Sequence, residues 1–167
     1  MSKLLIIVDM QKGFDYINPN SLAKTFNNIS KTFDDVCFAM FENQLESLFE
    51  TKLKWKDFQN EEDKSLINDI DVPEKAKFIW HSTYTVYTKE LKELISKLNN
   101  PEIYIAGLFS NVCLIKLAMD MFDDGIVPYI IKDLSRSNST DGVHDVAFAT
   151  MKMAIGPDRI ITTKEII

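Results

Sequence analysis

The chain has 167 residues, of which 46% are hydrophobic and 26% are charged, and its formal net charge is −6. This length and composition predict a single globular domain over residues 1–167 that buries about 70% of the surface of its unfolded chain. The acidic balance, without a dense Lys/Arg cluster, argues against a nucleic acid or an anionic membrane as a partner.

Cysteine usage and the first apolar run bear on the cellular compartment. Cys37 and Cys113 do not form a CxxC pair, so the sequence predicts neither a disulfide framework nor a zinc-finger site. The opening apolar run, 4–8, is interrupted by Asp9 and is too short for a signal peptide or a membrane span. We therefore expect a cytoplasmic protein.

The N-terminal part of the chain alternates apolar runs with a helical pattern. Residues 4–8 (LLIIV) form a continuous apolar run, which is typical of a strand covered by helices on both faces. A helical pattern follows over 22–33, after a turn-rich stretch at 18–20. Residues 35–41 (DVCFAMF) predict a second buried strand, in which Cys37 has a packing role.

Residues 42–71 are the least regular part of the chain. We expect a short helix near 44–52 and then an excursion that carries Trp55 and Phe58, with the acidic residues 61–63 in a solvated loop. A segment of this length at the active edge of a sheet forms either the wall or lid of a pocket or a contact between subunits. The sequence leaves that choice open.

The remainder of the chain continues the alternation of strands and helices. Strands are expected at 77–80, at 103–106, at 127–131 with its end at Asp133, and at 159–162, and helices at 89–98, from Ser110 or Asn111 to Gly125, and at 142–153. Right-handed crossovers between such strands predict an α/β fold, in which a doubly wound, mainly parallel sheet has helices on both faces and three layers in all.

Two residues at strand ends have side chains suited to catalysis. Asp9 follows the first strand, where ligands of parallel α/β sheets bind, although a carboxylate there could equally cap a loop. Gln11 could orient Asp9 or bond a loop. Cys113 lies in the first turn of the helix after strand 103–106, where unpaired N–H groups and the helix dipole favour a thiolate. The alternative for Cys113 is a small apolar residue packed beneath the sheet.

In combination, these residues resemble the isochorismatase-like cysteine hydrolase family. The likeness is carried along the whole chain by LLIIVDMQKGF at 4–14, AGLFSNVCL at 106–114, and FDDGIVPYIIKD at 122–133 followed by His144. The segment MFENQLESLFETKLKW at 40–55 also resembles a sub-branch of uncharacterised family members. The resemblance implies the strand order 3-2-1-4-5-6 and hydrolysis of an amide or carbamoyl C–N bond in a small molecule.

The resemblance also implies which residues react. Hydrolases of this family use an Asp–Lys–Cys triad, which matches Asp9 and Cys113, and His81 stands where the family has its lysine. In this hypothesis Cys113 forms an acyl-enzyme, Asp9 acts as general base and acid, and protonated His81 supplies the positive charge. A member that has lost hydrolysis and binds a ligand or a protein is the alternative, and a redox-sensing thiol is a third class.

Further residues near the site follow from the same resemblance. Phe14, Tyr84, Leu108 and Phe109 are expected to bind substrate, and the peptide bond between the last two is expected to be cis. For the aromatic residues, packing in the core is the alternative. His144 is expected to make a structural hydrogen bond rather than to take part in catalysis.

The histidine count bears on cofactors. The metal motif of nicotinamidases needs an Asp-x-His pair and a further histidine, whereas this chain has only His81 and His144 and lacks the motif. We therefore expect no metal or other cofactor, and nicotinamide becomes a less favoured substrate. Members of the family usually form oligomers, so we expect a homodimer or homotetramer, with a small-molecule substrate as the other partner.

Overall fold

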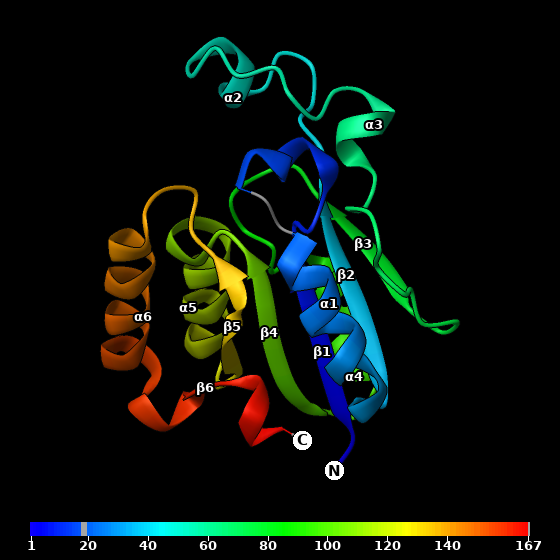
Figure 1. Cartoon of the computed structure of the whole chain (residues 1–167), viewed down its shortest axis with the longest axis vertical. Helices are drawn as coiled ribbons and strands as arrows, with labels where there is room; N and C mark the ends of the chain where they lie inside the picture. Colours follow the sequence, from blue (N-terminus) through cyan, green and yellow to red (C-terminus); the bar gives the residue numbers. More distant parts are fainter. Residues whose placement is uncertain (18–19, 167) are drawn as a thin grey trace.

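The chain is built around one parallel sheet. A computed structural model describes residues 1–17 and 20–166. The turn expected at 18–20 therefore lies mostly outside the described residues. The strands are β1 (Lys3–Val8), β2 (Asp35–Phe41), β3 (Lys77–His81), β4 (Glu102–Leu108), β5 (Tyr129–Arg136) and β6 (Ile160–Ile161). Their order is β3-β2-β1-β4-β5-β6, and each pairs in parallel with its neighbours (Figure 1). This arrangement confirms the predicted doubly wound sheet.

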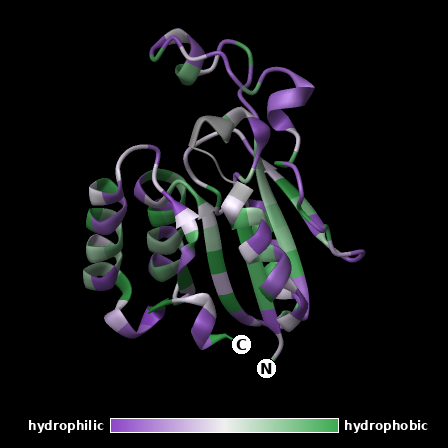
Figure 2. Ribbon diagram, viewed as in Figure 1, coloured by the Kyte–Doolittle hydropathy of each residue, from purple (hydrophilic) through white to green (hydrophobic). Residues whose placement is uncertain are grey.

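Four helices cover the two faces of the sheet: α1 (Asn20–Ile29), α4 (Lys89–Lys97), α5 (Ile115–Asp123) and α6 (Asp141–Ile155). The short helices α2 (Leu48–Thr51) and α3 (Glu61–Lys64) lie beyond one edge of the sheet. Apolar side chains of α4, α5 and α6 pack on one face and those of α1 on the other, so the molecule has three layers (Figure 2). Within the described part of the chain, none of the helices combines the length and apolarity needed to cross a membrane.

The continuous apolar run of β1 reflects its central place. Leu4, Ile6 and Val8 join the core on the α4–α6 face, whereas Leu5 and Ile7 join the core on the α1 face. All of these side chains are fully buried. Because both faces of β1 are covered, every position from Leu4 to Val8 is apolar rather than every second one.

Two helix predictions need correction. The α-helical part of the pattern at 22–33 ends at Ile29 and continues as a 3-10 turn, Ser30–Thr32. Residues 61–63 lie in α3 instead of a solvated loop, because the Asn60 side chain accepts a hydrogen bond from the Asp63 N–H and caps the helix. The helix near 44–52 is present but shorter, as α2.

The fifth strand also differs from its prediction. It begins at Tyr129, directly after Pro128, and continues to Arg136 instead of ending at Asp133. The Asp133 carboxylate accepts hydrogen bonds from the backbone N–H of Thr163 at 2.9 Å and from its hydroxyl at 2.6 Å. Asp133 therefore ties the C-terminal segment to the sheet.

Candidate active site

The active edge of the sheet begins where β4 approaches β1. Gly107 has a φ of +117°, and a Cβ there would overlap the backbone of Val8. Only glycine combines this backbone angle with so close an approach. As a result, the turn that follows β4 lies directly beside the residue that follows β1.

Asp9 is that residue, and it is a buried carboxylate. Its backbone N–H donates to the Ala39 carbonyl at 2.9 Å, which extends the ladder toward β2 by one residue. Its φ of 53° is left-handed, a conformation that aspartate tolerates better than most residues. The residue is 1% exposed, so its hydrogen-bond partners must come from the protein itself.

His81, the last residue of β3, meets Asp9 across the end of β2. Its Nε2 lies 2.7 Å from Oδ1 of Asp9, and its Nδ1 lies 2.8 Å from the carbonyl oxygen of Thr83. A carbonyl oxygen can only accept, so Nδ1 carries a hydrogen. The histidine and the carboxylate then share one proton between Nε2 and Oδ1.

The charge of this pair follows from its surroundings. Burial has the largest influence on the pKa of His81 and lowers it, but the charge and hydrogen bond of Asp9, with the bond to Thr83, raise the pKa above its ordinary value overall. The site therefore favours an imidazolium beside an ionised carboxylate.

Cys113 reaches the same carboxylate from the turn after β4. The peptide bond between Leu108 and Phe109 is cis, as the resemblance implied. The chain then passes through the π-helical turn Ser110–Leu114 into α5. Cys113 is 8% exposed, and its thiol forms a hydrogen bond with Asp9.

The prediction of an easily ionised Cys113 is wrong for the resting protein. Burial raises its pKa well above the ordinary value, and the charge of Asp9 and the hydrogen bond to it act in the same direction. A hydrogen bond from the Phe109 backbone N–H opposes these effects without reversing them. The resting thiol therefore keeps its proton and shares it with a carboxylate that can accept it.

The side chains expected to cap the Cys113 helix bond elsewhere. The residue at the N-cap is Phe109. The Ser110 hydroxyl lies 3.0 Å from Nδ1 of His144, so that histidine makes the hydrogen bond expected of it, and Asn111 donates to the Asn138 side chain at 2.8 Å. These contacts join the turn to α6 and to the loop before it.

A cavity of about 470 Å³ opens onto Asp9 and Cys113. Of the residues expected to bind substrate, Phe14, Tyr84 and Phe109 line it, whereas Leu108 is fully buried in the core on the α1 face. The ring of Trp55, from the excursion expected to form a wall or a subunit contact, also lines the cavity. The rings of Phe41 and Phe49, which sequence reasoning did not assign to the site, complete the aromatic part of the lining.

Two other predicted residues lie outside the reacting set. Gln11 donates its side-chain amide to the carbonyls of Phe41 and Lys64 and accepts from the Phe41 N–H, so it bonds the backbone around the cavity. Cys37 is fully buried in β2, where burial raises its pKa to about 12. Its packing role is therefore confirmed.

Comparison with known proteins places this arrangement in a family. The family model described as the Isochorismatase domain matches residues 3–165. The chain belongs to the isochorismatase family. Among curated proteins, none matches this family member significantly.

Solved structures share the fold at low sequence identity. A nicotinamidase from Bacillus subtilis has a TM-score of 0.80 and 19% identity, with 96% of this chain and 99% of that chain covered. A pyrazinamidase of Pyrococcus horikoshii in complex with zinc has a TM-score of 0.77 and 16% identity, with 98% and 99% covered. An isochorismatase-like hydrolase from Alkaliphilus metalliredigens has a TM-score of 0.79 and 12% identity, with 99% and 96% covered.

The zinc in one of these structures raises the question of a metal site in this isochorismatase-family protein. Within residues 1–17 and 20–166, no group of three or more His, Cys, Asp or Glu side chains is arranged to hold a metal ion. Both ring nitrogens of His81 have protein partners. Asp57 is followed by Phe58 and Gln59, so it does not begin an Asp-x-His pair, and its carboxylate accepts a hydrogen bond from the Trp55 indole at 2.8 Å. The donor set does not fit a metal site of the nicotinamidase kind.

Proposed function

We propose that this protein is a cysteine hydrolase that cleaves an amide or carbamoyl C–N bond in a small molecule. The observation that supports the proposal most strongly is a single buried carboxylate, Asp9, hydrogen-bonded both to the Cys113 thiol and to His81. A nucleophile, a base and an orienting group within hydrogen-bond reach are the recurring parts of nucleophilic catalysis. The cavity brings a substrate to the same two residues, Asp9 and Cys113.

In the first half of the reaction, Asp9 takes the thiol proton while the Cys113 sulfur attacks the substrate carbonyl carbon. The carbonyl oxygen gains the negative charge, and backbone N–H groups of the turn at Phe109 and Cys113 stabilise it. When the intermediate collapses, the C–N bond breaks and the leaving nitrogen takes the proton from Asp9. A thioester on Cys113 remains.

In the second half, water replaces the amine. Asp9 takes a proton from the water as its oxygen attacks the thioester carbonyl, and the C–S bond then breaks. The product acid leaves, and the Cys113 sulfur recovers the proton from Asp9. No net proton is gained or lost by the protein over the cycle.

His81 carries the role that a lysine has in the family hydrolases. As an imidazolium it stabilises ionised Asp9 in the resting site and the Cys113 thiolate that forms when Asp9 takes the proton. Since the proton moves from sulfur to carboxylate beside a fixed positive charge, the net charge of the three groups stays constant. This role requires His81 to be protonated.

A ligand-binding protein without turnover is the second candidate. The observation that favours it is the burial of Cys113, which together with Asp9 keeps the thiol protonated in the resting protein. In this case the same cavity retains a ligand and the cysteine remains unmodified.

The test combines turnover with detection of the acyl-enzyme. Primary amides and N-carbamoyl compounds, nicotinamide among them, are screened for ammonia release, and intact-protein mass spectrometry follows the Cys113 adduct. We expect turnover that Cys113→Ala abolishes and that Asp9→Asn reduces by at least about 10²-fold. Cys37→Ser serves as the control and retains activity. Turnover that survives Cys113→Ala would contradict the mechanism, and a ligand retained without an adduct would support the binding protein.

A further inference from the structure

One wall of the cavity comes from a short stretch of chain, residues 43–59, which we call the 43–59 segment. It contributes Phe49, Leu53 and Trp55 to the lining, while the opposite side is built from residues around the sheet edge. In Figure 1 its helix α2 stands above that edge, apart from the helices that cover the two faces. Phe58 anchors the end of the segment in the core on the α1 face, and polar contacts within the segment hold the rest.

Trp55 is the centre of this wall. Its ring is stacked on Phe41 at 5.6 Å between centroids and 14° between planes, and on Phe14 at 6.3 Å and 24°. Phe49 meets the Trp55 ring edge-on at 5.7 Å. Trp55 lines the same cavity as Cys113, so a shift of the Trp55 ring would change the shape of that cavity.

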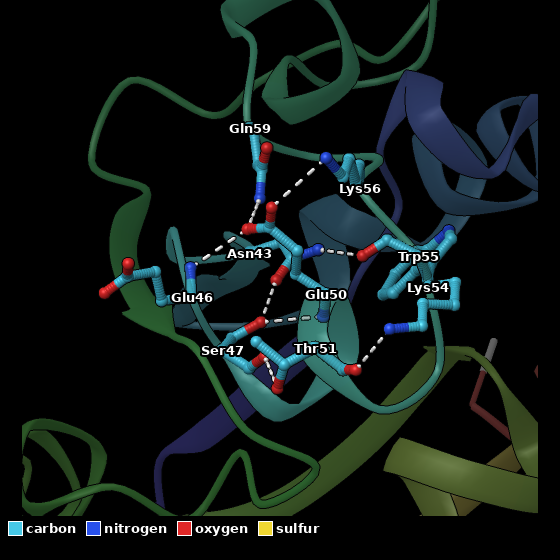
Figure 3. Close-up of polar contacts among 9 residues, drawn as sticks. All are labelled: Asn43, Glu46, Ser47, Glu50, Thr51, Lys54, Trp55, Lys56 and Gln59. Carbon is cyan, nitrogen blue, oxygen red and sulfur yellow. Dashed lines mark hydrogen bonds and ion pairs between the residues drawn. The ribbon is translucent and has the colours of Figure 1, made fainter.

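The backbone at Trp55 is held by Asn43, outside the reacting residues. The Asn43 side-chain amide donates to the Trp55 carbonyl oxygen at 2.9 Å, and its oxygen accepts from the Ser47 hydroxyl at 2.6 Å (Figure 3). Its backbone N–H donates to the Phe58 carbonyl at 3.1 Å. Asn43 thus joins the beginning of the segment to its end, and it is only 4% exposed.

A further group of polar contacts lies within the segment, around Ser47 and Glu50. Ser47 caps α2 by accepting from the Glu50 N–H at 3.2 Å. The Glu50 carboxylate accepts from the Glu46 N–H and from the Gln59 amide, both at 2.9 Å, and pairs with Lys56 at 3.4 Å (Figure 3). These partners are more exposed than Asn43, so water can replace them more easily than it can replace the buried amide.

We propose that Asn43 is a positioning residue that determines specificity: it holds Trp55 where the wall accepts a flat, uncharged, apolar group next to Cys113. The cavity supports this class of group because its lining is mainly aromatic rings. Lys116 also lines the cavity, but its ammonium group lies 2.7 Å from the Asp120 carboxylate. The positive charge of Lys116 is therefore already balanced. This inference depends on the proposed function in one respect: it requires that the Cys113 thiol can react.

Two alkylating reagents with the same reacting carbon test the proposal without turnover. Iodoacetamide carries no apolar group, whereas its N-phenyl derivative, iodoacetanilide, carries a flat ring. We expect iodoacetanilide to modify Cys113 with saturable kinetics, and we expect Asn43→Asp to lower the ratio of the two rate constants, iodoacetanilide to iodoacetamide, about tenfold. Aspartate can still accept from Ser47 but cannot donate to the Trp55 carbonyl, and a tenfold change is the scale of one lost buried hydrogen bond.

The matched control and a second variant separate positioning from folding. Gln44→Ala removes a neighbouring exposed amide that donates to the Glu42 side chain, and it should leave the ratio unchanged. Trp55→Ala keeps the Asn43 side chain but removes the ring, so it should lose the same selectivity. Emission of Trp55 in a Trp80→Phe background reports whether the wall moves in Asn43→Asp, and urea unfolding reports whether the chain is folded.

The outcomes are distinct. An unchanged ratio in folded Asn43→Asp or in Trp55→Ala overturns the proposal, as does alkylation by iodoacetanilide without saturation in the wild type. If selectivity is present but amides are not hydrolysed, the proposed function fails and this inference stands. If amides are hydrolysed but the ratio of the two alkylation rate constants does not change in these variants, the proposed function stands and this inference fails.

Discussion

The carboxylate of Asp9 connects two groups that would otherwise titrate independently. It shares a proton with His81 at 2.7 Å and accepts a hydrogen bond from the Cys113 thiol. Its negative charge therefore raises the pKa of both partners, which favours a protonated imidazole and a protonated thiol at once. The protonation of His81 and that of Cys113 are therefore linked through one carboxylate.

The first prediction concerns Cys113 and follows from that charge. In the wild type the thiol should ionise at a pH above its ordinary value of 9.0, because burial and Asp9 both raise its pKa. Asp9→Asn removes the charge, so the pKa of Cys113 should fall even though the proposed hydrolysis is lost. Absorbance of the thiolate near 240 nm, taken as a difference from Cys113→Ser, measures this pKa. A pKa in the Asp9→Asn variant equal to or above the wild-type value contradicts the coupling.

The second prediction concerns His81 and the stability of the fold. Because the pKa of His81 is raised above the ordinary 6.5, the folded protein binds more protons than the unfolded chain between the two values. The stabilisation is fully present below 6.5 and is lost as pH rises through the folded-state value. Urea unfolding from pH 6 to 9 should show this decline in the wild type and a weaker one in His81→Gln. If the free energy of unfolding falls equally with pH in the wild type and in His81→Gln, the pKa of His81 is not raised.

The third prediction concerns the charge at position 81 in catalysis. If protonated His81 supports the Cys113 thiolate, activity should fall as pH rises through the pKa of His81. Lysine keeps its charge to higher pH, so His81→Lys should extend activity to more alkaline conditions. The pH profile of kcat/KM for the two proteins decides this, and an identical alkaline limit would assign that limit to another group.

At the scale of elements, the junction of β4 and β1 places the reacting turn. Gly107 allows the two strands to approach where a Cβ would overlap Val8. The turn that carries Cys113 then starts beside Asp9, which directly follows β1. Displacement of this junction would therefore disturb both the sheet and the site.

The fourth prediction tests this junction. Gly107→Ala should lower the free energy of unfolding by at least about 2 kcal/mol, because it combines a disfavoured φ with steric overlap. Gly125→Ala is the control: its φ of +81° is also left-handed, but as far as the described residues extend a Cβ there points into open space. It should cost about 1 kcal/mol. Denaturant unfolding measures the free energy of unfolding of both variants. Equal losses in Gly107→Ala and Gly125→Ala would show that the structure relieves the steric overlap at Gly107.

The sequence predicted features that leave a local pattern, and it did not predict those that depend on contacts between residues far apart in the chain. The run at 4–8 and the one at 35–41 predicted buried parallel strands, because burial on two faces leaves a local pattern. The proximity of His81 to Asp9 left no such pattern and entered only through family resemblance, since the two lie across the end of β2. The pKa of Cys113 was predicted in the wrong direction because the helix end is a local feature, whereas burial and Asp9 come from the tertiary fold.

The rest of the site escaped prediction for a related reason. Trp55 was recognised as part of an excursion, but nothing in its sequence neighbourhood indicates the Asn43 amide twelve residues away. Side-chain hydrogen bonds to the backbone have no periodicity to detect. Leu108 was expected in the pocket because of its place in the turn, and it points into the core on the α1 face instead.

At the scale of the whole molecule, stability is distributed unevenly. The central strands β1, β2 and β4 are paired on both sides and buried on both faces. In the 43–59 segment only Phe58 joins the buried apolar core, most of the polar contacts are short-range hydrogen bonds, and Leu45, Leu48 and Leu53 are exposed.

The fifth prediction follows from this distribution. Amide hydrogens of the central strands should exchange only through global unfolding, whereas those of the 43–59 segment should exchange through local opening at much lower free energy. Hydrogen exchange followed by mass spectrometry resolves the two regions. Equal protection in both would show that the segment opens only with the whole fold.

The strand order also affects how the chain emerges during synthesis. β1 is made first, but one of its two neighbours, β4, begins only at Glu102. Until then this apolar central strand has an unpaired edge, and such an edge is a template for pairing with other chains. A nascent chain of this protein is therefore at greatest risk of aggregation before β4 has left the ribosome, and Cys113, which follows β4 in the chain, leaves the ribosome only after it.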